Sequence, residues 1–174
     1  GKGLSAQWRW SQTDPDEVIF TDDNNAPITA LEKYNAATNT FSVIKDFSPT
    51  YEELTPDLNG GVSNPSLDGR YWPLGLKKAG VWYACCWDRQ TDTILCEIPL
   101  PERPGTGLGT IIMVDMAPSG NKITVWANGA WTYPRGISVF SRAGVYERTL
   151  DHNVGATNIV VHHHLGVDTA GNDV

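Results

Sequence analysis

The sequence predicts an all-β protein, a partial β-propeller of about three and a half four-stranded blades. Its 174 residues include 17 Gly and 11 Pro, which indicates many short strands joined by tight turns. A hydrophobic content of 40% is sufficient for a buried core. Helical periodicity is scarce, and the short run 51–54 is interpreted as a loop because Pro56 and two glycines follow it. The third observation is an internal repeat.

The first half of the repeat is a strand, a turn of Pro, Asp and Gly residues, and a second strand. Four segments share this pattern: 10–20, 64–72, 116–125 and 167–174. Intervals of 53, 51 and 51 residues result when four positions are aligned, namely Glu17, Arg70, Asn121 and Asn172. Glycine suits such turns because it adopts positive φ without steric cost. The near-constant spacing predicts one structural unit per interval.

The second half of the repeat is another hairpin. Its polar turns are expected at 35–39, 89–92 and 141–144, each between two strand-like segments. Every unit therefore contains four antiparallel strands, which is the composition of a propeller blade. The predicted units are about 5–55, 56–105 and 106–158, with the start of a fourth at 159–174, in a single domain.

The repeat count predicts an unfinished ring. Propellers close with four to eight blades, and closure removes exposed sheet edges. We expect this chain to be part of a six- to eight-bladed ring, so that a seven-bladed parent would need roughly 360 residues. The missing blades would come from the rest of the chain or from another chain.

The turn motifs resemble those of the TolB-type and related WD40-like propeller repeats. The segments that carry this resemblance are Trp10-Ser11 with Asp14-Pro15-Asp16, 64–69 and 117–120 for the first turn, and 34–38 and 88–91 for the second. The first unit departs from the family pattern by an apparent insertion of Gln12-Thr13 and the lack of the turn glycine. The resemblance implies a propeller fold. Because these repeats occur in partners of membrane assemblies, in peptidases and in polysaccharide lyases, it implies no single activity.

Charge and hydropathy exclude two classes of partner. The formal net charge is −7, and no basic cluster longer than Lys77-Lys78 occurs, so nucleic-acid binding is not expected. No apolar run is long enough for a membrane helix. The sequence leaves the cellular compartment open, with an extracellular or periplasmic location slightly favoured.

The run His162-His163-His164 is the first candidate site. On a strand, His162 and His164 share one side, and two histidines in this arrangement can hold Zn²⁺ or Mn²⁺. His152 could join them. The alternatives are contact with a ligand without metal and a purely structural role, and no cofactor is certain.

Aromatic residues suggest a second candidate site. Trp126, Trp131 and Tyr133, with Arg135 beside them, are assigned to a loop of the third unit where they could bind a sugar ring. Packing in the core is favoured for three other tryptophans, namely Trp10, Trp82 and Trp87.

The three cysteines do not have the spacing of a zinc site. If Asp88 pairs with Thr93, a regular hairpin places Cys85 opposite Cys96, where a disulfide is one possibility. A strained Cys85-Cys86 disulfide is another, and buried free thiols are the favoured one.

Three functions fit these observations. The first is a scaffold that binds a protein or a glycan. The second is a carbohydrate-active enzyme, such as a polysaccharide lyase, with a histidine-lined channel site. The third is a structural repeat in a larger extracellular or particle assembly.

Overall fold

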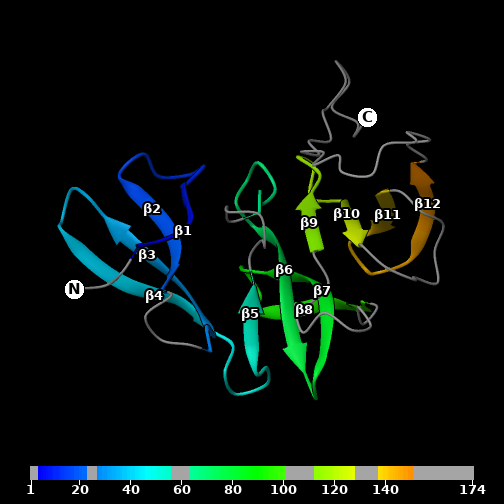
Figure 1. Ribbon diagram of the computed structural model, residues 1–174. Coiled ribbons are helices and arrows are strands. Elements are labelled where there is room, and N and C mark those ends of the chain that lie inside the picture. Colours follow the sequence, from blue (N-terminus) through cyan, green and yellow to red (C-terminus); the bar gives the residue numbers. More distant parts are fainter. Residues whose placement is uncertain (1–3, 23–26, 56–62, 101–111, 128–136, 151–174) are drawn as a thin grey trace.

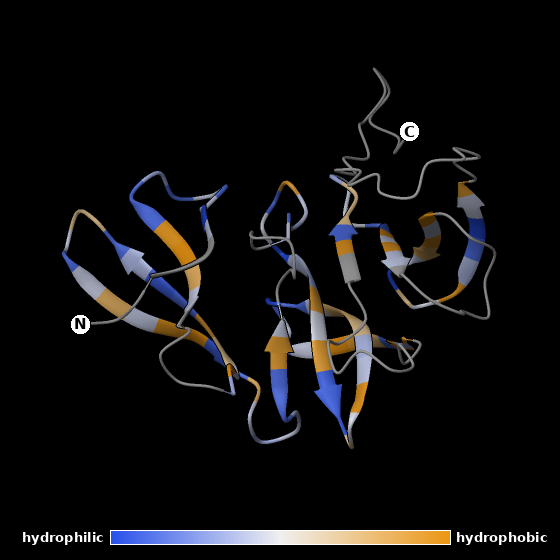
Figure 2. Cartoon of the chain, in the orientation of Figure 1, coloured by the Kyte–Doolittle hydropathy of each residue, from blue (hydrophilic) through white to orange (hydrophobic). Residues whose placement is uncertain are grey.

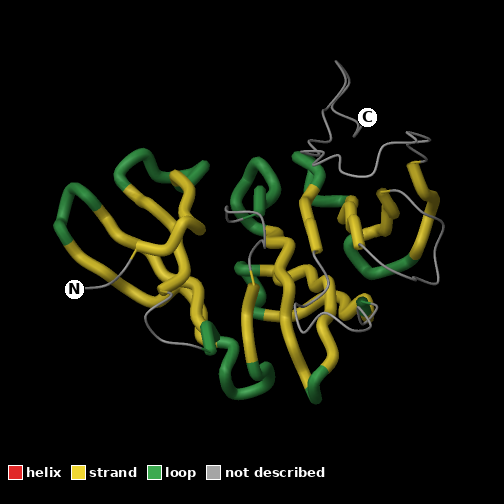
Figure 3. The backbone as a smooth tube through the Cα atoms, in the orientation of Figure 1, coloured by secondary structure: helices red, strands yellow, loops and turns green. Residues whose placement is uncertain are grey.

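In a computed structural model of the protein, three β-sheets lie side by side in chain order (Figure 1). The structure describes residues 4–22, 27–55, 63–100, 112–127 and 137–150. All regular elements in these ranges are strands (Figure 3). These ranges therefore contain no long apolar helix that could cross a membrane. The predicted all-β fold class is confirmed, and the fourth repeat unit lies outside the described residues.

Each sheet contains four antiparallel strands in chain order, as a propeller blade requires. Blade 1 consists of β1 (Leu4–Trp10), β2 (Glu17–Asp22), β3 (Ala30–Asn35) and β4 (Thr40–Asp46). Blade 2 consists of β5 (Glu53–Thr55), β6 (Tyr71–Lys78), β7 (Val81–Asp88) and β8 (Thr93–Pro99). Blade 3 consists of β9 (Ile112–Met116), β10 (Lys122–Ala127), β11 (Ile137–Ser141) and β12 (Tyr146–Leu150). The run 51–54 is not wholly a loop, because β5 begins within it.

The first turn of each blade is closed by an equivalent backbone hydrogen bond. The amides of Ser11, Ser66 and Ala117 donate to the carbonyls of Glu17, Tyr71 and Lys122, respectively, at 2.8, 3.0 and 3.0 Å. Glu17 is therefore equivalent to Tyr71, and the predicted alignment of Glu17 with Arg70 is wrong by one position. The cause is one additional residue in the first turn of blade 1, where the sequence shows an apparent insertion.

The second turns lie where the sequence predicts them. Each ends on a residue with left-handed backbone conformation, at φ 53°, 53° and 82° for Asn39, Asp92 and Gly144. In blade 2 the Asp88 carboxylate accepts the amide hydrogen of Gln90 at 3.0 Å, which caps the turn. The two hairpins of each unit are thus specified locally by turn chemistry.

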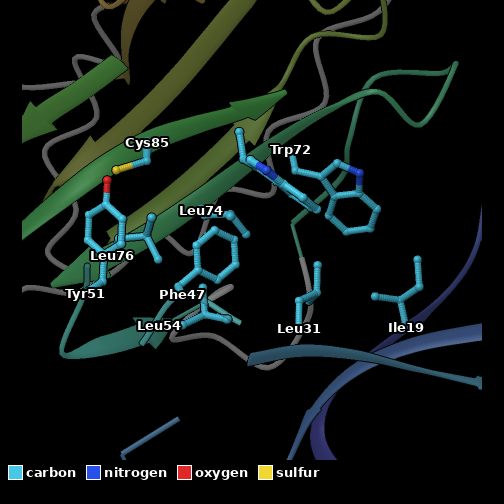
Figure 4. Close-up of a cluster of buried hydrophobic side chains, with 10 residues drawn as sticks. Ile19, Leu31, Phe47, Tyr51, Leu54, Trp72, Leu74, Leu76 and Cys85 are labelled. Carbon is cyan, nitrogen blue, oxygen red and sulfur yellow. The ribbon is translucent and has the colours of Figure 1, made fainter. Parts of the chain in front are cut away.

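The hydrophobic core lies between the blades. Ile19 and Leu31 of blade 1 pack against Trp72 and Leu74 of blade 2, as Figure 4 shows. A second cluster joins blade 2 to blade 3 and includes Cys86 and Phe140. Figure 2 shows hydrophobic segments on strands of all three sheets. The core predictions for Trp87 and Trp82 are confirmed, since Trp87 is buried in the first cluster and half-buried Trp82 packs against the second.

The cysteine pairing differs from the prediction. Asp88 does pair with Thr93, but a bulge between Cys86 and Trp87 shifts the register. Cys96 therefore faces Cys86, and Cys85 faces Glu97. A bulge adds one residue to one strand of a pair, so a regular count from the turn fails beyond it. All three thiols are free; Cys85 and Cys86 are buried, as favoured from the sequence, whereas Cys96 is half-buried.

We expect the native protein to react slowly with a thiol reagent such as DTNB at pH 8. Burial raises the pKa of Cys86 to about 12 and that of Cys96 to about 11, and the pKa of Cys85 is also well above its usual value. Since the thiolate is the nucleophile, little reactive species is present. Cys96 should react first because it is the least buried. Equal rates in native and denaturing buffer would contradict this expectation.

Candidate functional site

The structure describes one of the predicted site residues. Trp126 lies within β10 and is half-buried, so it belongs to a strand and not to a loop. His162, His164, Trp131, Tyr133 and Arg135 lie outside the described residues, and their roles stay predictions. Within the described part of the chain, no group of three or more His, Cys, Asp or Glu residues could hold a metal ion.

A polar chain connects the three repeat units. Arg9, Asn64 and Asp115 occupy equivalent positions, each two residues before the turn-closing residue of its unit. Arg9 Nη1 donates to the Ser63 carbonyl at 2.7 Å, and Nη2 donates to Asn64 Oδ1 at 2.5 Å. The backbone N–H of Asn64 in turn donates to Asp115 Oδ1 at 3.1 Å. These contacts join the three repeat units at equivalent positions, just before the first turn of each unit.

The electrostatics of this chain combine two opposed effects. Burial lowers the pKa of Arg9, whereas the nearby Asp115 carboxylate raises it. The hydrogen bonds through Asn64 keep Arg9 and Asp115 near each other. None of these residues was singled out from the sequence. The sequence did contain one signal for them: Arg9 and Asn64 are 55 positions apart and Asn64 and Asp115 are 51 apart, which is close to the repeat period.

A second feature is an aromatic and aliphatic face on blade 1, which we call the free face. One row crosses all four strands and consists of Trp10, Val18, Tyr34 and Phe41. The next row consists of Trp8, Phe20, Glu32 and Val43. Trp8, Trp10, Phe41 and Val43 are 49%, 55%, 49% and 55% exposed, respectively, whereas Phe20 and Glu32 in the middle of the second row are buried. Ile19 and Leu31 point to the opposite side of the sheet, toward blade 2.

The equivalent faces of the other two blades are buried. In blade 2 the corresponding row is Trp72, Trp87 and Ile94, which packs against blade 1. In blade 3 it is Met116, Ile123, Phe140 and Tyr146, which packs against blade 2. The free face is thus the surface that a blade uses to contact the preceding blade. Trp10, predicted to be a core residue, is exposed because no described blade precedes its own.

A small pocket of about 200 Å³ lies between blades 1 and 2. Lys45 Nζ and Asp92 Oδ2 form an ion pair at its rim, 2.7 Å apart. Trp87 Nε1 donates to the other Asp92 oxygen at 3.1 Å. Phe47 and Tyr51 also line the pocket and are buried. Lys45, Trp87 and Asp92 therefore bond to one another across this pocket.

Comparisons with known proteins identify the fold. No protein-family model matches the sequence, and no curated protein sequence matches it. Among solved structures, the chain is similar to TolB from Acinetobacter baumannii, with a TM-score of 0.54, 16% identity and 84% of this chain covered. A structure from work on two prolyl endopeptidases is a weaker match, with a TM-score of 0.43 and 16% identity over 78% of this chain and 20% of that chain.

The similarity to TolB extends over 32% of the TolB chain, about one third of its length. At this level of identity it shows the fold alone. The three sheets form part of a β-propeller, and the resemblance to TolB-type propellers predicted from the turn motifs is confirmed.

Proposed function

We propose that this chain is a protein-binding β-propeller scaffold whose free face packs against a further propeller blade. The exposure of four large apolar side chains on the free face is the observation that supports the proposal most directly. Blades 2 and 3 bury the equivalent rows, whereas Trp8, Trp10, Phe41 and Val43 are about half exposed. The further blade belongs to the rest of the chain or to another chain.

The composition of the free face favours a flat, apolar partner. Phe41 packs at 4.8 Å from Tyr34 and at 5.9 Å from Phe20, measured between ring centroids, so the outer strand β4 already contributes to a continuous aromatic layer. Burial of apolar surface contributes about 25 cal/mol per Å², and large exposed apolar patches mark interaction sites. A sheet with aliphatic side chains would complement this layer, as Ile19 and Leu31 complement Trp72.

Hydroxyl-radical footprinting of the native protein, compared with the 174-residue chain alone, tests the proposal. Trp8, Trp10 and Phe41 should be modified several-fold more slowly in the native protein, because the further blade covers them. Val145 and Leu95 are exposed and lie outside the free face, so they serve as internal controls. Equal modification of the three aromatic residues in both samples would refute the proposal.

The intact mass of the native subunit distinguishes the two sources of the further blade. A mass well above 19.1 kDa indicates the same chain, and a mass of 19.1 kDa with protection retained indicates a second chain. A Trp10→Asp/Phe41→Asp double variant should abolish the protection of Trp8 in either case, since charged groups in the buried interface are strongly unfavourable.

A further inference from the structure

The described lysines are all paired with carboxylates. Their ion pairs are Lys33 with Glu17, Lys45 with Asp92, Lys77 with Glu53, Lys78 with Glu97, and Lys122 with Glu147. Arg70 likewise pairs with Asp88. Arg89, Arg142 and Arg148 differ, because no carboxylate within the described ranges forms an ion pair with them. Of these three, Arg142 is the one whose guanidinium is stacked on a buried aromatic ring.

Arg142 is nevertheless held in place. Its guanidinium carbon lies 4.3 Å from the centroid of the Tyr71 ring, and that of Arg70 lies 4.8 Å from the same ring. Arg70 is itself fixed by two hydrogen bonds to the Asp88 carboxylate, at 3.0 and 2.7 Å. The backbone amide of Arg142 donates to the Asn121 carbonyl at 3.0 Å. Stacking on a buried aromatic ring restrains a guanidinium while its N–H groups stay able to donate.

Apolar surface adjoins this guanidinium. The Leu67 amide donates to the Pro118 carbonyl at 2.9 Å, which joins the first turns of blades 2 and 3. Gly120 of the same turn packs on Tyr71, and Arg142 Nη1 lies 3.5 Å from the Gly120 carbonyl oxygen. Leu67 is 62% exposed. We call Leu67, Tyr71, Pro118 and Arg142 the turn patch.

We infer that the turn patch binds an acidic segment of a protein partner, with Arg142 contacting its carboxylates and Leu67 contacting an apolar side chain. A guanidinium offers a planar fork of donors that matches a carboxylate in a bidentate geometry. The chain carries a net charge of −7, so it repels acidic ligands at long range, and recognition depends on this local, unneutralised guanidinium. The turn patch lies on blades 2 and 3, and this interaction is independent of the free face of blade 1.

Fluorescence anisotropy with a labelled peptide of glutamates and leucines tests the inference at low ionic strength, where charge contacts are least screened. The peptide should bind the 174-residue chain, and a matched glutamine-leucine peptide, which carries no side-chain charge, serves to test the charge requirement. Arg142→Gln should weaken binding of the acidic peptide by about fivefold or more, and Arg142→Lys should restore it in part, because it keeps the charge but loses the fork. Leu67→Ala should weaken it by a smaller factor.

Arg148→Gln is the matched control, because Arg148 is an exposed arginine on β12 outside the turn patch. An equal loss of binding in Arg148→Gln and Arg142→Gln would show a general charge effect and overturn the inference. The inference would also be overturned if the wild type failed to bind the acidic peptide, or if it bound both peptides equally. Inorganic phosphate is the second probe. If it displaces the peptide at equal concentration, the patch is a simple anion site and the protein partner is refuted.

Discussion

Replacing Trp72 with alanine is expected to lower the free energy of unfolding by about 3–5 kcal/mol. Trp72 is 1% exposed and lies in the cluster that joins blades 1 and 2. Its Nε1 donates to the Gly69 carbonyl at 2.9 Å, so the substitution also leaves a buried acceptor without this donor. The loss combines the transfer free energy of a large side chain with the cavity that remains.

Urea denaturation followed by far-UV circular dichroism measures this effect. Leu95→Ala is the control, because Leu95 is an aliphatic residue of β8 that is 37% exposed, and we expect a loss of about 1 kcal/mol or less. Trp72→Phe, which keeps an aromatic ring, extends the test if the alanine variant does not fold. Similar stabilities of Trp72→Phe, Leu95→Ala and the wild type would show that the contact between blades 1 and 2 contributes little.

Replacing Gly120 with alanine should destabilise the protein by about 2–4 kcal/mol, from backbone strain and steric overlap together. Gly120 has φ 74°, a conformation that costs an L-residue about 1–2 kcal/mol. A Cβ at this position would lie 2.5 Å from Cδ2 of Tyr71 and 3.1 Å from Cβ of Ser66. Tyr71 cannot move aside easily, because its ring is stacked with both Arg70 and Arg142.

Gly80→Ala measures the part of the destabilisation that comes from backbone strain alone. Gly80 has nearly the same φ, 77°, but a Cβ there would meet no atom within 4 Å. The difference in free energy of unfolding between the two variants, from urea titrations, therefore measures the overlap with Tyr71. Equal losses would show that the turn of blade 3 can relax away from blade 2, and would weaken the description of Arg142 as rigidly held.

Much of the fold could be predicted because the signals are local. Glycines in first turns and polar residues in second turns determine where a strand must reverse, whatever lies around it. Gly69 and Gly120 both adopt positive φ, and Asp88 caps the turn that follows it. Strand alternation and the near-constant interval then specify the four-stranded unit.

The errors occurred where an extra residue enters a turn or a strand. One additional residue before Glu17 shifted the repeat alignment, and a bulge beside Cys86 moved Cys96 opposite it. Neither the extra turn residue nor the bulge changes the composition or the hydrophobic periodicity enough to be predicted from a single sequence. The polar chain from Arg9 to Asp115 was missed for a related reason, since residues more than fifty positions apart become neighbours only after the blades assemble.

The sequence by itself determined the all-β class, the repeat of four strands and the position of the turns, because these depend on dihedral preferences and on hydrophobic periodicity within a few residues. The tertiary structure decided which apolar residues are buried. Trp10 and Trp72 lie beside the first turns of their blades and point to the same side, yet Trp10 is 55% exposed and Trp72 is 1% exposed. Burial depends on what packs against a face, and only the arrangement of the blades shows that blade 1 precedes blade 2 while no described blade precedes blade 1.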